Sequence, residues 1–98
     1  MKYTTNKNGA VLEVTVSGRL DTLTAPELDK ALAPLLSGVE SLVFDFTNLD
    51  YISSAGLRVL LAVHRGIAMG GKTTLKNCNP VVKEVLEVTG FNDVFEIE

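Results

Sequence analysis

The chain has 98 residues, of which 46% are hydrophobic and 21% charged, and its formal net charge is −3. This composition fits one compact domain and argues against intrinsic disorder, which requires fewer apolar residues or more net charge. Nine Lys and Arg against twelve Asp and Glu lack the basic excess of a nucleic-acid binder, so no nucleic-acid partner is expected. The single cysteine, Cys78, excludes an internal disulfide and fits a reducing compartment.

The N-terminus, MKYTTNKNG, is polar and has no apolar segment of the kind found in signal peptides. The longest apolar stretch, residues 57–63, contains Arg58 and ends at His64. Because a membrane helix needs about 20 mostly apolar residues, we expect neither export nor membrane insertion. We therefore expect residues 1–98 to form a single domain in the cytoplasm.

The first residues predict a β-hairpin. The turn dipeptide Asn8-Gly9 lies between two short runs that are typical of strands. The second run alternates apolar and polar side chains, and its core-facing residues are expected to be Leu12, Val14 and Val16.

Several signals mark the start of a helix after this hairpin. Thr24 is the expected N-cap, with Glu27 completing a capping box. Leu23 and Leu28 are expected to form a hydrophobic staple across the helix start. Pro34 is expected to kink or shorten the last turn.

The middle of the chain predicts a strand and a second helix. Residues 41–46, SLVFDF, form a short apolar run, which predicts a central strand covered on both faces. The spacing of the next apolar residues predicts a helix that begins within two residues of Ser54 and stops at Gly70-Gly71.

The last third predicts a brief strand over residues 72–77 and a helix that begins at Pro80, with Asn79 as N-cap. The alternation of strands and helices predicts an α/β fold with right-handed crossovers. We expect a four- or five-stranded mixed sheet with the helices mainly on one face.

Residues 66–73, GIAMGGKT, match the G-x-x-x-x-G-K-[ST] pattern of a phosphate-binding loop. That chemistry needs a strand before the loop and a helix after it. Here a helical pattern precedes the glycines and a strand pattern follows them, so we interpret the segment as the end of a helix. We expect no cofactor, and a small nucleotide-binding protein remains only the third functional hypothesis.

The other candidate reactive residues lack the neighbouring side chains that a metal site or a catalytic site requires. His64 and Cys78 are the only soft metal ligands, and no third residue completes a zinc site or a nucleophilic Cys-His site. Asp45 lacks the acidic pair and the lysine that a receiver-type phosphoacceptor needs. We therefore expect no catalytic residue and no metal, and we do not expect an enzyme.

Ser53 and Ser54 lie where a predicted helix begins, after a predicted central strand. Open α/β sheets place their functional sites at this edge. Serine is a favoured N-cap, so one hydroxyl can simply satisfy a backbone N–H group. A phosphate at the same place would meet free N–H groups and the positive end of the helix dipole. The residues alone leave both interpretations open.

The stretch DFTNLDYISSAGLRVLL, with GRLDTLTAPEL before it and the tail VVKEVLEVTGFNDVFEI, resembles the STAS domain family, specifically its stand-alone bacterial anti-sigma-factor antagonists. The family pattern D-[LF]-[ST]-x-[LV]-x-[FY]-[ILM]-D-S-[SAT]-G-L places the phosphorylated serine directly before the [SAT]-G pair. Anchored on Gly56, that serine corresponds to Ser54. Ser53 stands where the family usually has aspartate and is a competing acceptor. Arg19 stands where the family often has glutamate, whereas Asp21 keeps the family's aspartate near the acceptor.

The resemblance implies a non-enzymatic binding switch. The unmodified protein would bind an anti-sigma factor that is also a serine kinase of the histidine-kinase-like ATPase type, which frees a sigma factor for transcription. Phosphate on Ser54 would abolish that binding, and a phosphatase would restore it. The alternative is a STAS subunit of a lipid-transport or signalling assembly that is not phosphorylated.

The helix after Ser54 carries apolar residues on more than one face. Val59, Val63 and Met69 are expected to lie partly off the core-facing stripe, and Arg58, Val59 and Val63 are expected to contact the partner. The alternative is that a neighbouring helix covers this surface.

Overall fold

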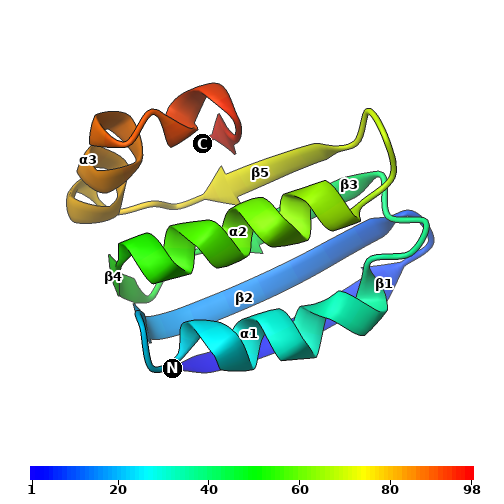
Figure 1. Ribbon diagram of the computed structural model, residues 1–98, viewed down its shortest axis with the longest axis horizontal. Coiled ribbons are helices and arrows are strands. Elements are labelled where there is room, and N and C mark those ends of the chain that lie inside the picture. Colours follow the sequence, from blue (N-terminus) through cyan, green and yellow to red (C-terminus); the bar gives the residue numbers. More distant parts are fainter.

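Strands and helices alternate through residues 1–98, all of which the computed structural model describes (Figure 1). The strands are β1 (Lys2–Asn8), β2 (Val11–Leu20), β3 (Ser41–Asp45), β4 (Leu49–Ile52), β5 (Lys72–Lys76) and β6 (Glu96–Ile97). The α-helices are α1 (Ala25–Leu32), α2 (Ser54–Gly66) and α3 (Pro80–Val88), and short 3₁₀ helices span Ala33–Leu35 and Phe91–Asp93. None of these helices combines the length and the apolar character that crossing a bilayer requires.

The sheet is mixed and has β3 at its centre, as the sequence predicts. Its strand order is β1-β2-β3-β5-β6, and β4 pairs with β2 off this path. Only β1 and β2 are antiparallel, and a two-residue turn joins them, where Gly9 has φ 61°. The sheet has six strands, more than the four or five predicted, because β4 and β6 are only 4 and 2 residues long, too short for a repeating pattern to mark them.

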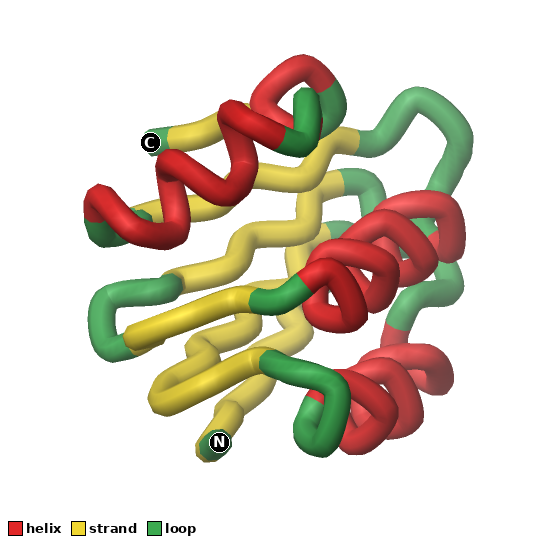
Figure 2. Tube along the Cα trace, turned by 60° about the vertical axis from the view of Figure 1, so that its left-hand side comes forward, coloured by secondary structure: helices red, strands yellow, loops and turns green.

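The helices pack against one face of the sheet, and that face holds the core. Figure 2 shows α1 and α2 on the same side of the strands. The alternation predicted for β2 is confirmed, with Leu12, Val14 and Val16 at 0–1% exposure. The prediction that β3 is covered on both faces is wrong: Phe44 is fully buried, whereas Val43 is only partly buried on the open face.

The start of α1 differs from its prediction in how its backbone groups are satisfied. Thr24 is the N-cap residue but makes no side-chain cap bond. Its hydroxyl instead donates to the Arg19 carbonyl at 2.8 Å and accepts from the Asp21 N–H group at 2.9 Å. The capping box with Glu27 does not form, because the Thr24 hydroxyl is already used in the loop before the helix.

The hydrophobic staple at this helix start is also absent. Leu28 is fully buried in the core, but Leu23 is 88% exposed. The expectation for Pro34 is confirmed, since the α-helix ends at Leu32 and a 3₁₀ turn follows. The loop before α1 therefore presents a large apolar side chain, Leu23, to solvent.

The structure contradicts the nucleotide-binding hypothesis. Helix α2 ends at Gly66, before the glycine pair predicted to stop it, and β5 begins at Lys72. Thr73 is buried within that strand, and its hydroxyl lies 2.6 Å from Nδ1 of His64. The glycine-rich motif thus precedes a strand instead of a helix, so no helix N-terminus is available to bind phosphate.

The predicted last helix is confirmed. The side chain of Asn79 accepts a hydrogen bond from the Val82 N–H group at 2.8 Å, and Pro80 occupies the first helical position. Gly90 follows the helix with φ 78°, in the left-handed region that favours glycine. Phe95 is buried and anchors the C-terminal segment to the core.

Candidate functional site

The carboxyl ends of β2 and β4 meet beside the start of α2, at one edge of the molecule (Figure 1). The two strands are parallel and pair Leu20 with Ile52. The Ser53 N–H group donates to the Leu20 carbonyl at 2.9 Å. This acceptor edge, which we define as residues 19–24 together with 51–56, is therefore one hydrogen-bonded unit.

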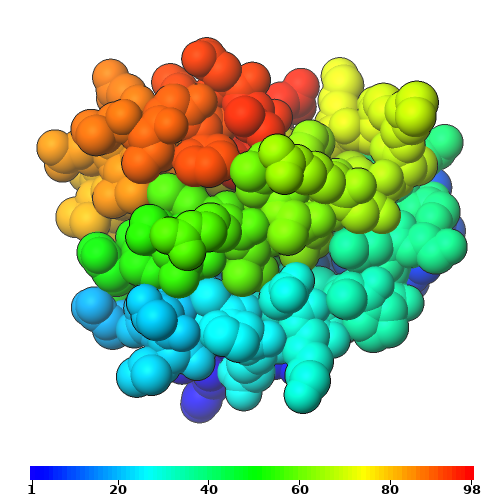
Figure 3. Space-filling model, viewed as in Figure 1, coloured from blue at the N-terminus to red at the C-terminus, as the bar shows by residue number.

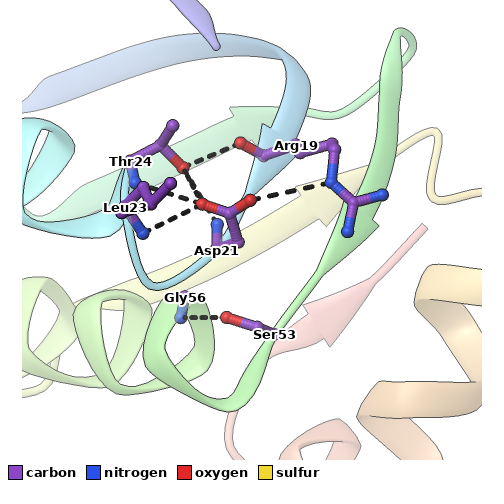
Figure 4. Close-up of polar contacts among 6 residues, drawn as sticks. All are labelled: Arg19, Asp21, Leu23, Thr24, Ser53 and Gly56. Atoms are coloured by element: carbon purple, nitrogen blue, oxygen red, sulfur yellow. Dashed lines mark hydrogen bonds and ion pairs between the residues drawn. The ribbon is translucent and has the colours of Figure 1, made fainter.

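Ser53 is the N-cap of α2. Its backbone is extended, and its Oγ accepts a hydrogen bond from the Gly56 N–H group at 3.4 Å (Figure 4). Its carbonyl accepts from the Leu57 N–H group at 3.0 Å. The side chain is half-buried, so its hydroxyl is both engaged and partly shielded.

Ser54 is the first residue of α2 and is exposed. Its hydroxyl takes part in none of the hydrogen bonds within the protein, in contrast to that of Ser53. The first turn of a helix has backbone N–H groups without helical partners, which favour a negative charge nearby. The local geometry thus leaves one serine free and uses the other to cap the helix.

Gly56 allows the start of α2 to approach the two strands closely. A Cβ at this position would lie 2.8 Å from the Leu20 carbonyl oxygen and 2.8 Å from Cγ1 of Ile52. Real Cβ contacts are not that short, so any larger residue would displace the helix start. Gly56 therefore contributes to the position of both serines.

Asp21 organises the loop between β2 and α1. One carboxylate oxygen accepts hydrogen bonds from the N–H groups of Leu23 and Thr24 at 3.0 and 3.2 Å (Figure 4). The other oxygen lies 3.6 Å from Nε of Arg19. Asp21 belongs to the acceptor edge, but its carboxylate bonds its own loop and neither serine.

Arg19 stacks on an aromatic ring of this edge. Its guanidinium carbon is 4.5 Å from the centroid of the Tyr51 ring, on the neighbouring strand β4. The arginine side chain is 61% exposed. Sequence reasoning missed this pair because Tyr51 was not assigned to a strand, and no local pattern links residues 32 positions apart.

The residues proposed for partner contact on α2 fall into two groups. Arg58 is exposed and Val59 is half-buried, whereas Val63 is only 1% exposed. The expectation that Val63 lies off the core-facing stripe is wrong, because α2 packs alongside α1. Figure 3 shows α2 as a band between α1 and the C-terminal residues, so only its outer ridge is available.

His64 and Cys78 serve the core instead of a reactive site. His64 contacts Thr73 and packs edge-on against Phe95, with ring centroids 5.7 Å apart. Cys78 is buried, and this burial raises the pKa of its thiol. The protein contains no group of three or more His, Cys, Asp or Glu side chains placed to hold a metal ion.

The substitution Asp21→Asn is expected to destabilise the protein at neutral pH but not in acid. Hydrogen bonds from the backbone of Thr24, and then from that of Leu23, hold the pKa of the Asp21 carboxyl below its usual 3.8. Such a group stabilises the folded state above pH 3.8, and this contribution is lost as the pH falls through the lower folded pKa. Urea unfolding over a pH series should show that the unfolding free energies of wild type and Asp21→Asn converge in acid.

The matched control is Asp29→Asn, which removes the same charge from an exposed carboxylate on α1 without side-chain hydrogen bonds. Asp29→Asn should follow wild type at every pH. A difference in unfolding free energy between wild type and Asp21→Asn that does not change with pH would contradict a role for the Asp21 charge.

Comparison with known proteins supports the resemblance seen in the sequence. The STAS domain family model matches residues 2–98. BtrV of Bordetella bronchiseptica (strain ATCC BAA-588 / NCTC 13252 / RB50), a putative anti-sigma factor antagonist, is 36% identical over 99 residues, which cover 99% of this chain and 85% of that protein. The anti-sigma-B factor antagonist of Bacillus subtilis (strain 168) is 26% identical over 87 residues, covering 88% of this chain and 80% of that protein.

Comparison with solved structures agrees with the sequence comparisons. The crystal structure of an anti-sigma factor antagonist from Mycobacterium paratuberculosis matches with a TM-score of 0.83 and 25% identity, over 98% of this chain and 85% of that one. Sequence pattern, family model and three-dimensional structure therefore agree over nearly the whole chain. The chain belongs to the STAS domain family.

Proposed function

We propose that this protein is an anti-sigma factor antagonist that works as a phosphorylation-controlled binding switch. Without phosphate it binds an anti-sigma factor that is also a serine kinase of the histidine-kinase-like ATPase type, and a sigma factor is released. Phosphate on Ser54 weakens this binding, and a phosphatase restores it. The role is one of binding in the cytoplasm, so no catalytic residue, metal or cofactor is assigned.

The observation that carries this proposal is the exposed Ser54 at the start of α2, with its hydroxyl free. Ser54 also occupies the position at which the family pattern has its phosphorylated serine. The 36% identity to a putative anti-sigma factor antagonist, over most of both chains, supports the same class of protein. Ser53 is the weaker acceptor, because its hydroxyl caps the helix.

A phosphate on Ser54 would change the surface more than the fold. It adds a charge of about −1.5 to −2, which free N–H groups and the helix dipole tolerate at a helix N-terminus. The exposed side chains of Leu23, in the loop of the acceptor edge, and of Arg58, four residues after Ser54 on α2, are the partner contacts that we propose. A dianion beside an apolar contact must lose water on docking, so binding becomes less favourable.

The test is to incubate the purified protein with ATP and a purified candidate anti-sigma kinase, and to locate phosphate by mass spectrometry. Wild type should carry one phosphate, on Ser54, and Ser54→Ala should carry none. Ser53→Ala is the matched control and should still be modified, because Ser54 remains accessible.

Equal phosphate uptake by wild type and Ser54→Ala would transfer the role to Ser53 or another hydroxyl. No uptake by wild type would favour the unphosphorylated STAS subunit of a lipid-transport or signalling assembly.

A further inference from the structure

Arg19 is an exposed cation that the fold holds in one place. Its Nε lies 3.6 Å from the Asp21 carboxylate (Figure 4). Its guanidinium also stacks on the Tyr51 ring, with the guanidinium carbon 4.5 Å from the ring centroid. Stacking on an aromatic face and a nearby carboxylate both restrict the rotamers of a long side chain. A side chain ordered in advance loses less entropy when it binds a partner.

The outer part of this guanidinium is free to bind. No hydrogen bond within the protein uses the Arg19 side chain, and that side chain is 61% exposed. Arginine has five N–H donors, and the pair on its outer edge matches the two oxygens of a carboxylate. Asp21 does not occupy this outer pair, because its ion pair with Arg19 is made to Nε, and its other oxygen is bonded within the loop.

Arg19 belongs to the same edge as the acceptor serine. It precedes Leu20, whose carbonyl accepts the hydrogen bond from the Ser53 N–H group. A kinase that transfers phosphate to Ser54 must cover this edge, because a serine hydroxyl has to enter its active site. Such a partner therefore comes within reach of the Arg19 guanidinium.

We propose that Arg19 determines partner specificity by binding a carboxylate side chain of the anti-sigma kinase; this inference rests on the proposed function. The occupant is a protein carboxylate and not the phosphate on Ser54: the guanidinium is held on the Tyr51 ring and beside Asp21, whereas the contact of the Ser53 side chain is with Gly56. A kinase with a basic residue at the corresponding place is rejected, since like charges at an interface oppose binding.

The experiment is a calorimetric titration of the full chain with a purified candidate anti-sigma kinase, with ADP so that no phosphate is transferred. We compare the affinities of wild type, Arg19→Gln, Arg19→Glu and Ser54→Asp at about 50 and about 300 mM salt. These concentrations lie on either side of about 0.1 M, where the screening length is about 10 Å. Arg65→Gln is the matched control: it removes the same charge from an exposed position at the other end of α2.

At low salt, Arg19→Gln should weaken binding about tenfold and Arg19→Glu about 30-fold or more, whereas Arg65→Gln should stay within about twofold of wild type. The effect of Arg19→Gln should shrink at high salt, because screening weakens a charge pair. If the Arg19 variants melt at the same midpoint as wild type, the loop of residues 19–24 is intact in them.

Three results would overturn the proposal. Arg19→Gln could bind like wild type while Ser54→Asp binds weakly, in which case the switch stands and Arg19 is not part of it. The effect of Arg19→Gln could be equal at both salt concentrations, which indicates a structural role. In separate melting experiments on samples phosphorylated beforehand, Arg19→Gln could melt lower than wild type while the unmodified proteins bind the kinase equally well, which assigns the guanidinium to the phosphate. Absence of binding by wild type would contradict the proposed function itself.

Discussion

Leu60→Ala is expected to lower the free energy of unfolding by about 2 to 5 kcal/mol. Leu60 is fully buried on the inward face of α2, together with Leu57 and Val63. Truncation to alanine removes buried apolar groups and leaves a cavity that the surrounding core fills only in part. Urea unfolding monitored by circular dichroism measures the difference.

The control for this prediction is Arg58→Ala, on the exposed face of the same helix. Its effect should be below about 1 kcal/mol, because an exposed side chain loses little on truncation. If Leu60→Ala left the unfolding midpoint unchanged, the inward face of α2 would have been assigned wrongly. The position of Ser54 would then also need revision, since Ser54 begins this helix.

Phosphate on Ser54 is expected to lower the affinity for the anti-sigma kinase about 100-fold, through desolvation and repulsion of a dianion in the interface. Ser54→Ala should bind within about twofold of wild type, because it keeps the surface neutral. The affinity of Ser54→Asp should lie between that of Ser54→Ala and that of the phosphorylated protein, since one carboxylate has about half the charge of a phosphate. Calorimetric titration of each variant checks this order, and equal affinities for Ser54→Ala and Ser54→Asp would contradict it.

Elements with strong local signals could be predicted from the sequence. The N-cap Asn79 is predicted correctly, and the hairpin turn is predicted to within one residue, because each depends on residues only two or three positions apart. The turn consists of residues 9 and 10, since Asn8 pairs with Val11 at the end of the ladder. The start of α2 at Ser54 follows from the same kind of local pattern. The acceptor edge could therefore be placed at the correct end of the sheet.

Features that depend on distant residues could not be predicted. Strand β4 forms by pairing with β2, and its own four residues contain no strand pattern. Because the sequence does not predict β4, it does not predict that the Arg19 guanidinium stacks on the Tyr51 ring. Val63 was assigned to the surface because periodicity does not show that α1 covers that side of α2.

Competition between local hydrogen bonds explains why the predicted capping box is absent. The segment before α1 contains the residues of a capping box, but Asp21 bonds the N–H groups of Leu23 and Thr24 first. The Thr24 hydroxyl then bonds the loop instead of the helix. Both arrangements satisfy the same kinds of backbone groups, so residue types alone do not distinguish them.

The central claim is that phosphate on Ser54 controls binding to an anti-sigma factor. The most direct measurement titrates the purified anti-sigma kinase with two samples of this chain, one unmodified and one phosphorylated stoichiometrically on Ser54, under identical conditions. We predict binding by the unmodified protein and an affinity about 100-fold lower for the phosphorylated one. Equal affinities for the two samples would contradict the claim.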